Sequence, residues 1–251
     1  MARAMAILAV CFCGLMHAQS AINAPQFEVA SIKPIGASND GYSSSGIKTG
    51  HGRLDAVNVT LKRCIMGAYG IGPHELSGGP DWINSERFMI AAKAEQPIDD
   101  DGALMVMLQN LLVERFKLVI HRETRTMQAF VLEVGKNGPK LEKAEGGPAE
   151  TNTSNGKGSV SIEARNTDLP AFAQRLAREM ELPVVNQTGL PGIYNFKLRW
   201  TPENSKALID GTAEWPSIFT AIQEQLGLRL HSQKAPVEVL VIDHVEKPSE
   251  N

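Results

Sequence analysis

Four stretches of the chain carry apolar residues at the i, i+3, i+4, i+7 spacing of an amphipathic helix. They cover residues 58–70, 102–116, 166–180 and 216–227. Residues 99–101 are all aspartate and precede the second stretch, while Ser217 and Gly227 lie near the two ends of the fourth. These residue types favour the ends of helices. The pattern therefore predicts four helices.

The same order of elements occurs twice along the chain. Residues 115–134 align with those from Gln225 onward at a constant offset of 110, which matches Leu118 with Leu228 and His121 with His231. Upstream, the stretches that begin at residues 58 and 166 align at an offset of 108. Each copy also holds an extended segment, 85–94 or 192–200, and ends in a stretch typical of strand, short turn and strand. The order predicts two units of strand, helix, strand, helix and β-hairpin.

Two such units predict an α+β protein of two similar lobes, each a mainly antiparallel sheet with two packed helices. We expect the first lobe over residues 25–140 and the second over 158–251. Between them, residues 141–157 are polar, contain glycine and have no apolar period, a composition typical of a linker. The polar stretch 36–52 predicts a mobile surface loop.

The first 20 residues have the composition of an export signal, with Arg3 before an apolar run over 4–16 and the small residues Ala18 and Ser20 after it. The run is shorter than the roughly 20 residues that cross a bilayer. We therefore expect a cleaved signal, a periplasmic or secreted mature protein, and no integral span after cleavage. A retained anchor is the alternative.

Charge and cysteine content narrow the possible partners and cofactors. The chain has 25 basic and 28 acidic residues, and losing Arg3 with the signal leaves a net charge near −4, which gives no reason to expect nucleic acid as a partner. Only Cys64 remains after the signal, so no internal disulfide is possible. Its place on an apolar helical stripe predicts a buried, unreactive thiol.

Asp243 and His244 are neighbours near the C-terminus, a combination found in general base catalysis. Neighbours on a strand point to opposite faces, however, so the two side chains are not expected to meet one substrate. The repeat aligns them with Glu133 and Val134, which include no imidazole. We expect structural roles for both, with a catalytic dyad as the alternative.

A metal site is not predicted at the aligned histidines His121 and His231. Metal ligands usually occur in closely spaced clusters, and neither histidine has a second His or a Cys within five residues. We assign no catalytic, cofactor-binding or metal-binding residue and expect no cofactor.

Several stretches together resemble a family of exported proteins of unknown function that is known from acidobacteria of the Solibacter type. They are FEVASIKP, LLVERFKLVIHRETR with VLEVGKNGPKL, PVVNQTGLPGIYNFKLRW, and PSIFTAIQEQLGL with APVEVLVIDHVEKPSEN. The resemblance implies a signal peptide and no assigned reaction. Some members join a similar region to a membrane metallopeptidase of the antibiotic-sensor type, which implies a sensing or interaction role outside the cytoplasm. In pattern alone, the chain is also similar to the short N-terminal domains of secretins and TonB-dependent receptors.

At two positions the chain differs from the residues that this family commonly shows. Asn186 and Asn195 stand where an Asp is frequent in the VVD-x-TGL and G-x-YDF stretches. An Asn keeps the hydrogen bonds of a turn but cannot act as a general base. We expect both to shape the turn over residues 189–192.

Export, repetition and the lack of a catalytic motif favour a non-enzymatic binding, interaction or sensory module outside the cytoplasm. Its partner is expected to be a protein or an envelope component. The alternative is a hydrolase that acts on an envelope or extracellular polymer, because paired carboxylates can meet in space without a sequence signature.

Overall fold

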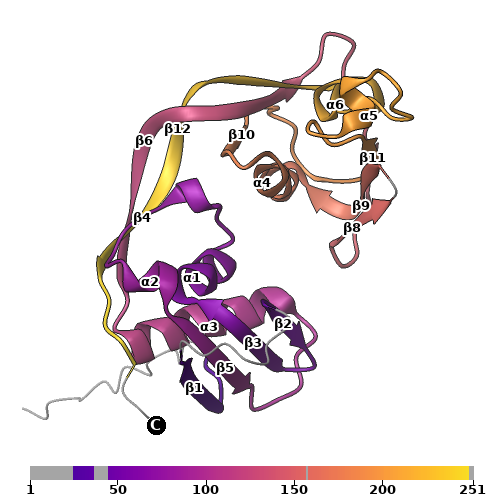
Figure 1. Cartoon of the computed structure of the whole chain (residues 1–251). Helices are drawn as coiled ribbons and strands as arrows, with labels where there is room; N and C mark the ends of the chain where they lie inside the picture. The colour runs from indigo at the N-terminus through magenta and orange to yellow at the C-terminus, as the bar shows by residue number, and fades with distance from the viewer. Residues whose placement is uncertain (1–24, 37–44, 157, 249–251) are drawn as a thin grey trace, which may run out of the picture.

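The computed structural model describes residues 25–36, 45–156 and 158–248, which form three four-stranded sheets and the helices packed on them (Figure 1). The expected export signal and residues 37–44 of the expected 36–52 loop lie outside these residues, and residues 46–50 of that stretch form a strand instead of a loop. The fold is α+β, as predicted, and most neighbouring strands are antiparallel. No helix in the described part of the chain is long and apolar enough to cross a membrane.

The first lobe is built on an antiparallel sheet of order β1–β5–β3–β2. Its strands are β1 (Val29–Ile35), β2 (Gly46–Gly50), β3 (Arg53–Thr60) and β5 (Arg87–Lys93). The helices are α1 (Leu61–Tyr69), α3 (Asp101–Phe116), the short α2 (Trp82–Ser85) and the 3₁₀ turn η1 (Pro73–Glu75). Phe88 and Phe116 meet edge to face in the first core, with ring centroids 5.4 Å apart.

The second lobe is built on an antiparallel sheet of order β7–β11–β9–β8. Its strands are β7 (Glu142–Lys143), β8 (Glu150–Gly156), β9 (Ser159–Asp168) and β11 (Ile193–Trp200). The helices are α4 (Leu169–Met180), α6 (Ile218–Leu226) and the short α5 (Lys206–Ile209). Phe172 and Phe196 meet edge to face in the second core, with ring centroids 4.7 Å apart.

The four long helices lie where the apolar period predicts them, and each starts at a side-chain cap. Thr60, Asp100, Asp168 and Ser217 accept hydrogen bonds from backbone N–H groups of the first turns of α1, α3, α4 and α6. At the other end, Gly227 closes α6 in the left-handed region, with φ of 65°. These caps satisfy helix-end groups that would otherwise lack partners.

The predicted β-hairpins at 115–134 and 225–245 are wrong. Instead, β6 (Val119–Val134) and β12 (Leu228–His244) are two continuous strands that pair antiparallel with each other along their whole lengths. We call this pair the ribbon, and Figure 1 shows it running along both lobes. The segments expected to turn lack the Gly or Asn-Gly that tight hairpin turns require, and threonine in one of them favours a strand.

Short parallel strands extend the ribbon on both sides and complete the third sheet. Strand β4 (Leu76–Gly78) pairs with β12, and β10 (Val184–Asn186) pairs with β6. As a result, Leu240 and Ile242 at the end of β12 pack in the first core, and Leu132 at the end of β6 packs in the second. Each core therefore contains a strand end from the other half of the chain.

The segment 141–157, expected to be a linker, contains β7 and β8, which form the two edges of the second lobe's sheet. The residues of β8 are almost all exposed. An edge strand needs main-chain hydrogen bonds but few apolar side chains, so a polar composition does not distinguish it from a linker.

A disulfide tests the pairing of the ribbon. Thr126 lies opposite Pro236 at its centre, and paired strand residues have Cα atoms about 4.5–5.5 Å apart, within the range for a disulfide. We expect the double variant Thr126→Cys with Pro236→Cys to form an intramolecular disulfide, detected by peptide mass spectrometry without reduction. The control pair Thr126→Cys with Ser232→Cys is out of register and should stay reduced. Separate hairpins would leave the first pair reduced as well.

Candidate functional site

A cleft of about 570 Å³ lies between the two lobes. In Figure 1, α1 and α4 face each other on the inner side of the ribbon, and both contribute to the cleft. The first lobe supplies residues of β2, α1, η1 and α3, and the second lobe supplies the C-terminal end of α4. The lining residues are Ile47, Thr49, Arg63, Met66, Gly67, Gly70, Ile71, Gly72, Pro73, His74, Met105, Ala177, Arg178 and Glu181.

Helix α1 and the turn that follows it form one wall of the cleft. Gly70 ends α1 with φ of 65°, a conformation that costs glycine little, and its N–H bonds to the carbonyl of Gly67. The N–H of Gly72 then donates to Glu75 Oε2 over 2.7 Å. These bonds fix the turn that presents Ile71 and His74 to the cleft.

The cleft has an apolar part made by side chains that are only partly covered. Met66, Ile71 and Met105 are half-buried, and all three pack against the edge of the first core. Methionine adapts its shape to different apolar partners. This part of the cleft therefore suits an apolar group of a ligand.

Two arginines bring positive charge to the cleft from opposite lobes, Arg63 from α1 and Arg178 from α4. Among the described residues, neither guanidinium has a hydrogen bond or an ion pair, whereas Arg175 pairs with Glu179 at 2.7 Å. Desolvation, then the charge of Arg175 and that of Arg63, lower the pKa of Arg178. The charge of Glu179 opposes this lowering, and Arg63 adds to it from the other wall of the same cleft. Glu181 also lines the cleft, without an ion pair to either arginine.

No sequence pattern points to Arg63 or Arg178 as site residues. Each lies on the polar face of an amphipathic helix, where a solvated charge is the ordinary expectation. Only the meeting of the two helices across the cleft distinguishes them from other surface arginines.

Asp243 and His244 pair with different side chains. Asp243 accepts from Nδ1 of His121 on the neighbouring strand at 2.9 Å, and His244 pairs with Glu246 at 2.9 Å. The ring of His121 is also 3.8 Å from Glu123 through Nε2, so both of its nitrogens face carboxylates. These side chains are exposed on the ribbon and do not line the cleft.

Both aligned histidines lie near a carboxylate of the opposite long strand. His121 pairs with Asp243, and Nδ1 of His231 lies 3.8 Å from Glu133. Cys64 is fully buried, as expected, and burial raises the pKa of its thiol to about 12, which disfavours the reactive thiolate. Within the described residues, no group of three or more His, Cys, Asp or Glu side chains has an arrangement that could hold a metal ion.

The two asparagines have different hydrogen-bonding roles. Asn186 Oδ1 accepts from the N–H and the hydroxyl of Thr188, which orders the residues directly before the turn over 189–192. Asn195 Oδ1 instead accepts from the N–H of Asn166, a residue with φ of 48°, so it stabilises a β-bulge of β9 and not the turn.

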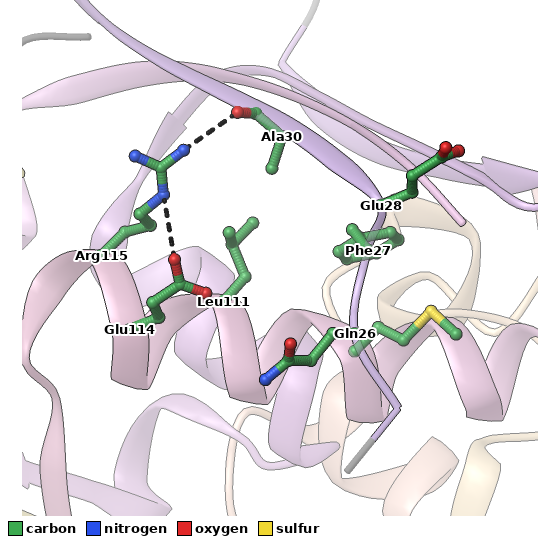
Figure 2. Close-up of a pocket in the computed structure, with 8 residues that line it drawn as sticks. Gln26, Phe27, Glu28, Ala30, Leu111, Glu114 and Arg115 are labelled. Atoms are coloured by element: carbon green, nitrogen blue, oxygen red, sulfur yellow. Dashed lines mark hydrogen bonds and ion pairs between the residues drawn. The ribbon is translucent and has the colours of Figure 1, made fainter. Parts of the chain in front are cut away.

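A smaller pocket lies between the start of β1 and α3 (Figure 2). Arg115 donates to the carbonyl of Ala30 at 3.1 Å and lies 3.7 Å from Glu114. The pocket has a volume of about 110 Å³, below the roughly 300–1,000 Å³ of typical ligand sites. The cleft between the lobes is therefore the better candidate.

Comparison with known proteins gives one match. The family model described as "Protein of unknown function (DUF3738)" matches residues 62–245, nearly three quarters of the chain. The matched region includes the ribbon and most residues of the cleft. No curated protein and no solved structure matches the chain.

The ion pair of His121 predicts a pH dependence. Its hydrogen bond to Asp243, and then the negative charges of Asp243 and Glu123, raise the pKa of His121 above 6.5. We expect Asp243→Asn to lower the midpoint of His121 in an NMR titration, whereas Asp99→Asn, which affects the distant His51, should leave it unchanged.

The same pair sets the sign of the stability effect. A raised folded-state pKa contributes stability that is present below pH 6.5 and is lost as pH rises through the folded pKa. The stability difference between the wild type and Asp243→Asn should therefore be larger at about pH 6 than at about pH 9. A larger difference at the higher pH would contradict this assignment.

Proposed function

Since the chain belongs to DUF3738, a family of proteins of unknown function, we propose that it is a non-enzymatic binding module that takes its ligand into the cleft between its lobes. The single observation that carries this proposal is the cleft itself, with a volume of about 570 Å³. Sites for small molecules typically span roughly 300–1,000 Å³ and combine apolar lining with a few polar groups. Met66, Ile71 and Met105 supply the apolar lining, and the two unpaired arginines supply the polar groups.

The module acts outside the cytoplasm, in the periplasm or after secretion. The export signal expected at residues 1–20 supports this location. A ligand-binding module at that location serves as a sensory or interaction component of the cell envelope.

The two lobes derive from an internal duplication. The strand orders β1–β5–β3–β2 and β7–β11–β9–β8 support it, because they agree position by position in chain order. The corresponding strands β3 and β9 each carry a bulge with an asparagine at positive φ. These are Asn58, at 54°, and Asn166, at 48°. These two asparagines are 108 positions apart, the same offset that aligns α1 with α4 in the sequence.

The pairings of the third sheet agree with the same relation. Leu76 of β4 lies opposite Leu240 of β12, and Val184 of β10 lies opposite Phe130 of β6. The offset of 108 leads from Leu76 to Val184, and the offset of 110 leads back from Leu240 to Phe130, so the first pair corresponds to the second. An approximate two-fold axis then crosses the ribbon where Thr126 meets Pro236, and it relates α1 to α4 on the two sides of the cleft.

A neutral fluorophore tests the cleft as a binding site. N-phenyl-1-naphthylamine is apolar and becomes brighter in an apolar site. We expect it to bind the protein with saturable fluorescence, and Met66→Trp, which fills the cleft, to reduce that binding at least about tenfold, the loss that about 1.4 kcal/mol of contact produces. Ile209→Trp is the matched control, because Ile209 is exposed on α5 and does not line the cleft.

Two results would contradict the proposal. One is binding of the fluorophore that Met66→Trp leaves unchanged. The other is hydrolysis of glycan, peptide or ester substrates by the purified protein that a single acidic substitution, such as Asp243→Asn, abolishes.

A further inference from the structure

The cleft holds two positive charges that the described part of the chain does not neutralise. Arg63 and Arg178 come from different lobes, and neither forms an ion pair with a residue of 25–36, 45–156 or 158–248. Both arginines are exposed residues that line the same cleft, and their like charges repel each other. Neither arginine is among the buried residues of its helix.

The nearby carboxylates offset the repulsion only in part, because desolvation and the charges of Arg175 and Arg63 still lower the pKa of Arg178 although the charge of Glu179 raises it. Glu179 is engaged by Arg175 at 2.7 Å, and Glu181 lines the cleft without reaching an arginine within the distance of an ion pair. The protein as a whole is acidic, with a net charge of −3, so the paired cations are a local feature and not part of a basic surface. An external anion between the two guanidinium groups would remove the repulsion.

We infer that Arg63 and Arg178 together bind the oxyanion group of an amphipathic ligand, whose apolar part lies against Met66, Ile71 and Met105. This inference rests on the proposed function of the cleft and adds the chemical class of its ligand. Carboxylate and phosphate both suit the site, because a guanidinium donates two parallel charge-assisted hydrogen bonds to either group. The two arginines come from different lobes, so the oxyanion also links the two walls of the cleft.

Displacement of N-phenyl-1-naphthylamine by octyl compounds tests the inference on the full chain. Octanoate and octyl phosphate carry the oxyanion, octanol carries no charge, and octyltrimethylammonium carries a positive charge on the same apolar chain. We expect one or both oxyanions to displace the fluorophore at concentrations at least about tenfold lower than octanol does, since charged hydrogen bonds contribute more than neutral ones. The ammonium compound should be the weakest. Comparing octanoate with octyl phosphate identifies the preferred head group.

Charge variants assign the effect to the two arginines. Arg63→Gln and Arg178→Gln should each weaken binding of the preferred oxyanion about tenfold or more and leave octanol unchanged. Glu181→Gln removes a like charge from the cleft wall and should strengthen oxyanion binding. Arg165→Gln is the matched control, because Arg165 is exposed on β9, pairs with Glu163 and does not line the cleft. Added salt should weaken the oxyanions but not octanol.

The outcomes separate this inference from the proposed function. Equal displacement by octanoate, octyl phosphate and octanol, with both arginine variants unchanged, overturns the oxyanion site while the cleft remains a binding site. Failure of the fluorophore to bind, or its binding outside the cleft, contradicts the proposed function instead. If the thermal unfolding curve of each variant matches that of the wild type, a loss of fold is excluded as the cause of weaker binding.

Discussion

The antiparallel pairing of β6 with β12 is the interaction on which the rest of the structure depends. The two strands pair from Leu228 opposite Val134 to His244 opposite Val119, across both lobes. Each strand crosses from one core to the other, so Leu240 and Ile242 fill the first core and Leu132 fills the second. Removal of either strand would expose apolar surface in both lobes and leave β4 or β10 without its partner. The lobes are therefore not independent units linked by a tether.

The ribbon also determines where the candidate site forms. It holds α1 and α4 on the same side (Figure 1). Residues at the C-terminal ends of both helices line one cleft. The apolar edge of the first core, at Met66 and Ile71, lies on one wall, and Arg178 approaches from the other. An anion that bridges Arg63 and Arg178 would add a contact between the lobes at the side opposite the ribbon. Ligand binding and the spacing of the lobes are then linked through the same two side chains.

Local patterns in the sequence predicted the parts of the fold that local interactions determine. The helical stripe with Leu61, Cys64 and Ile65 is buried as expected, and Gly227 ends α6 in the left-handed conformation. The ribbon was not predictable in this way, because alternation along a strand states which residues face the core but not which strand lies beside it. Two adjacent halves of one hairpin and two long strands that pair across the chain have the same periodicity.

The candidate site was even less visible in the sequence. Arg63 and Arg178 are 115 positions apart and lie on polar helix faces, where charged residues carry no signal of function. The His121–Asp243 pair is equally invisible in the sequence, because its members lie on different strands, 122 positions apart. Both cases depend on non-local pairing by the ribbon.

Separation of the two halves of the chain tests the central role of the ribbon most directly. Fragments cut between Gly146 and Gly147 would each contain one long strand, and their thermal unfolding can be followed by circular dichroism alone and after mixing. If the ribbon joins both cores, neither fragment unfolds cooperatively by itself, and the mixture regains one cooperative transition as a one-to-one complex. Cooperative unfolding of either fragment alone, unchanged by the other, would contradict the account.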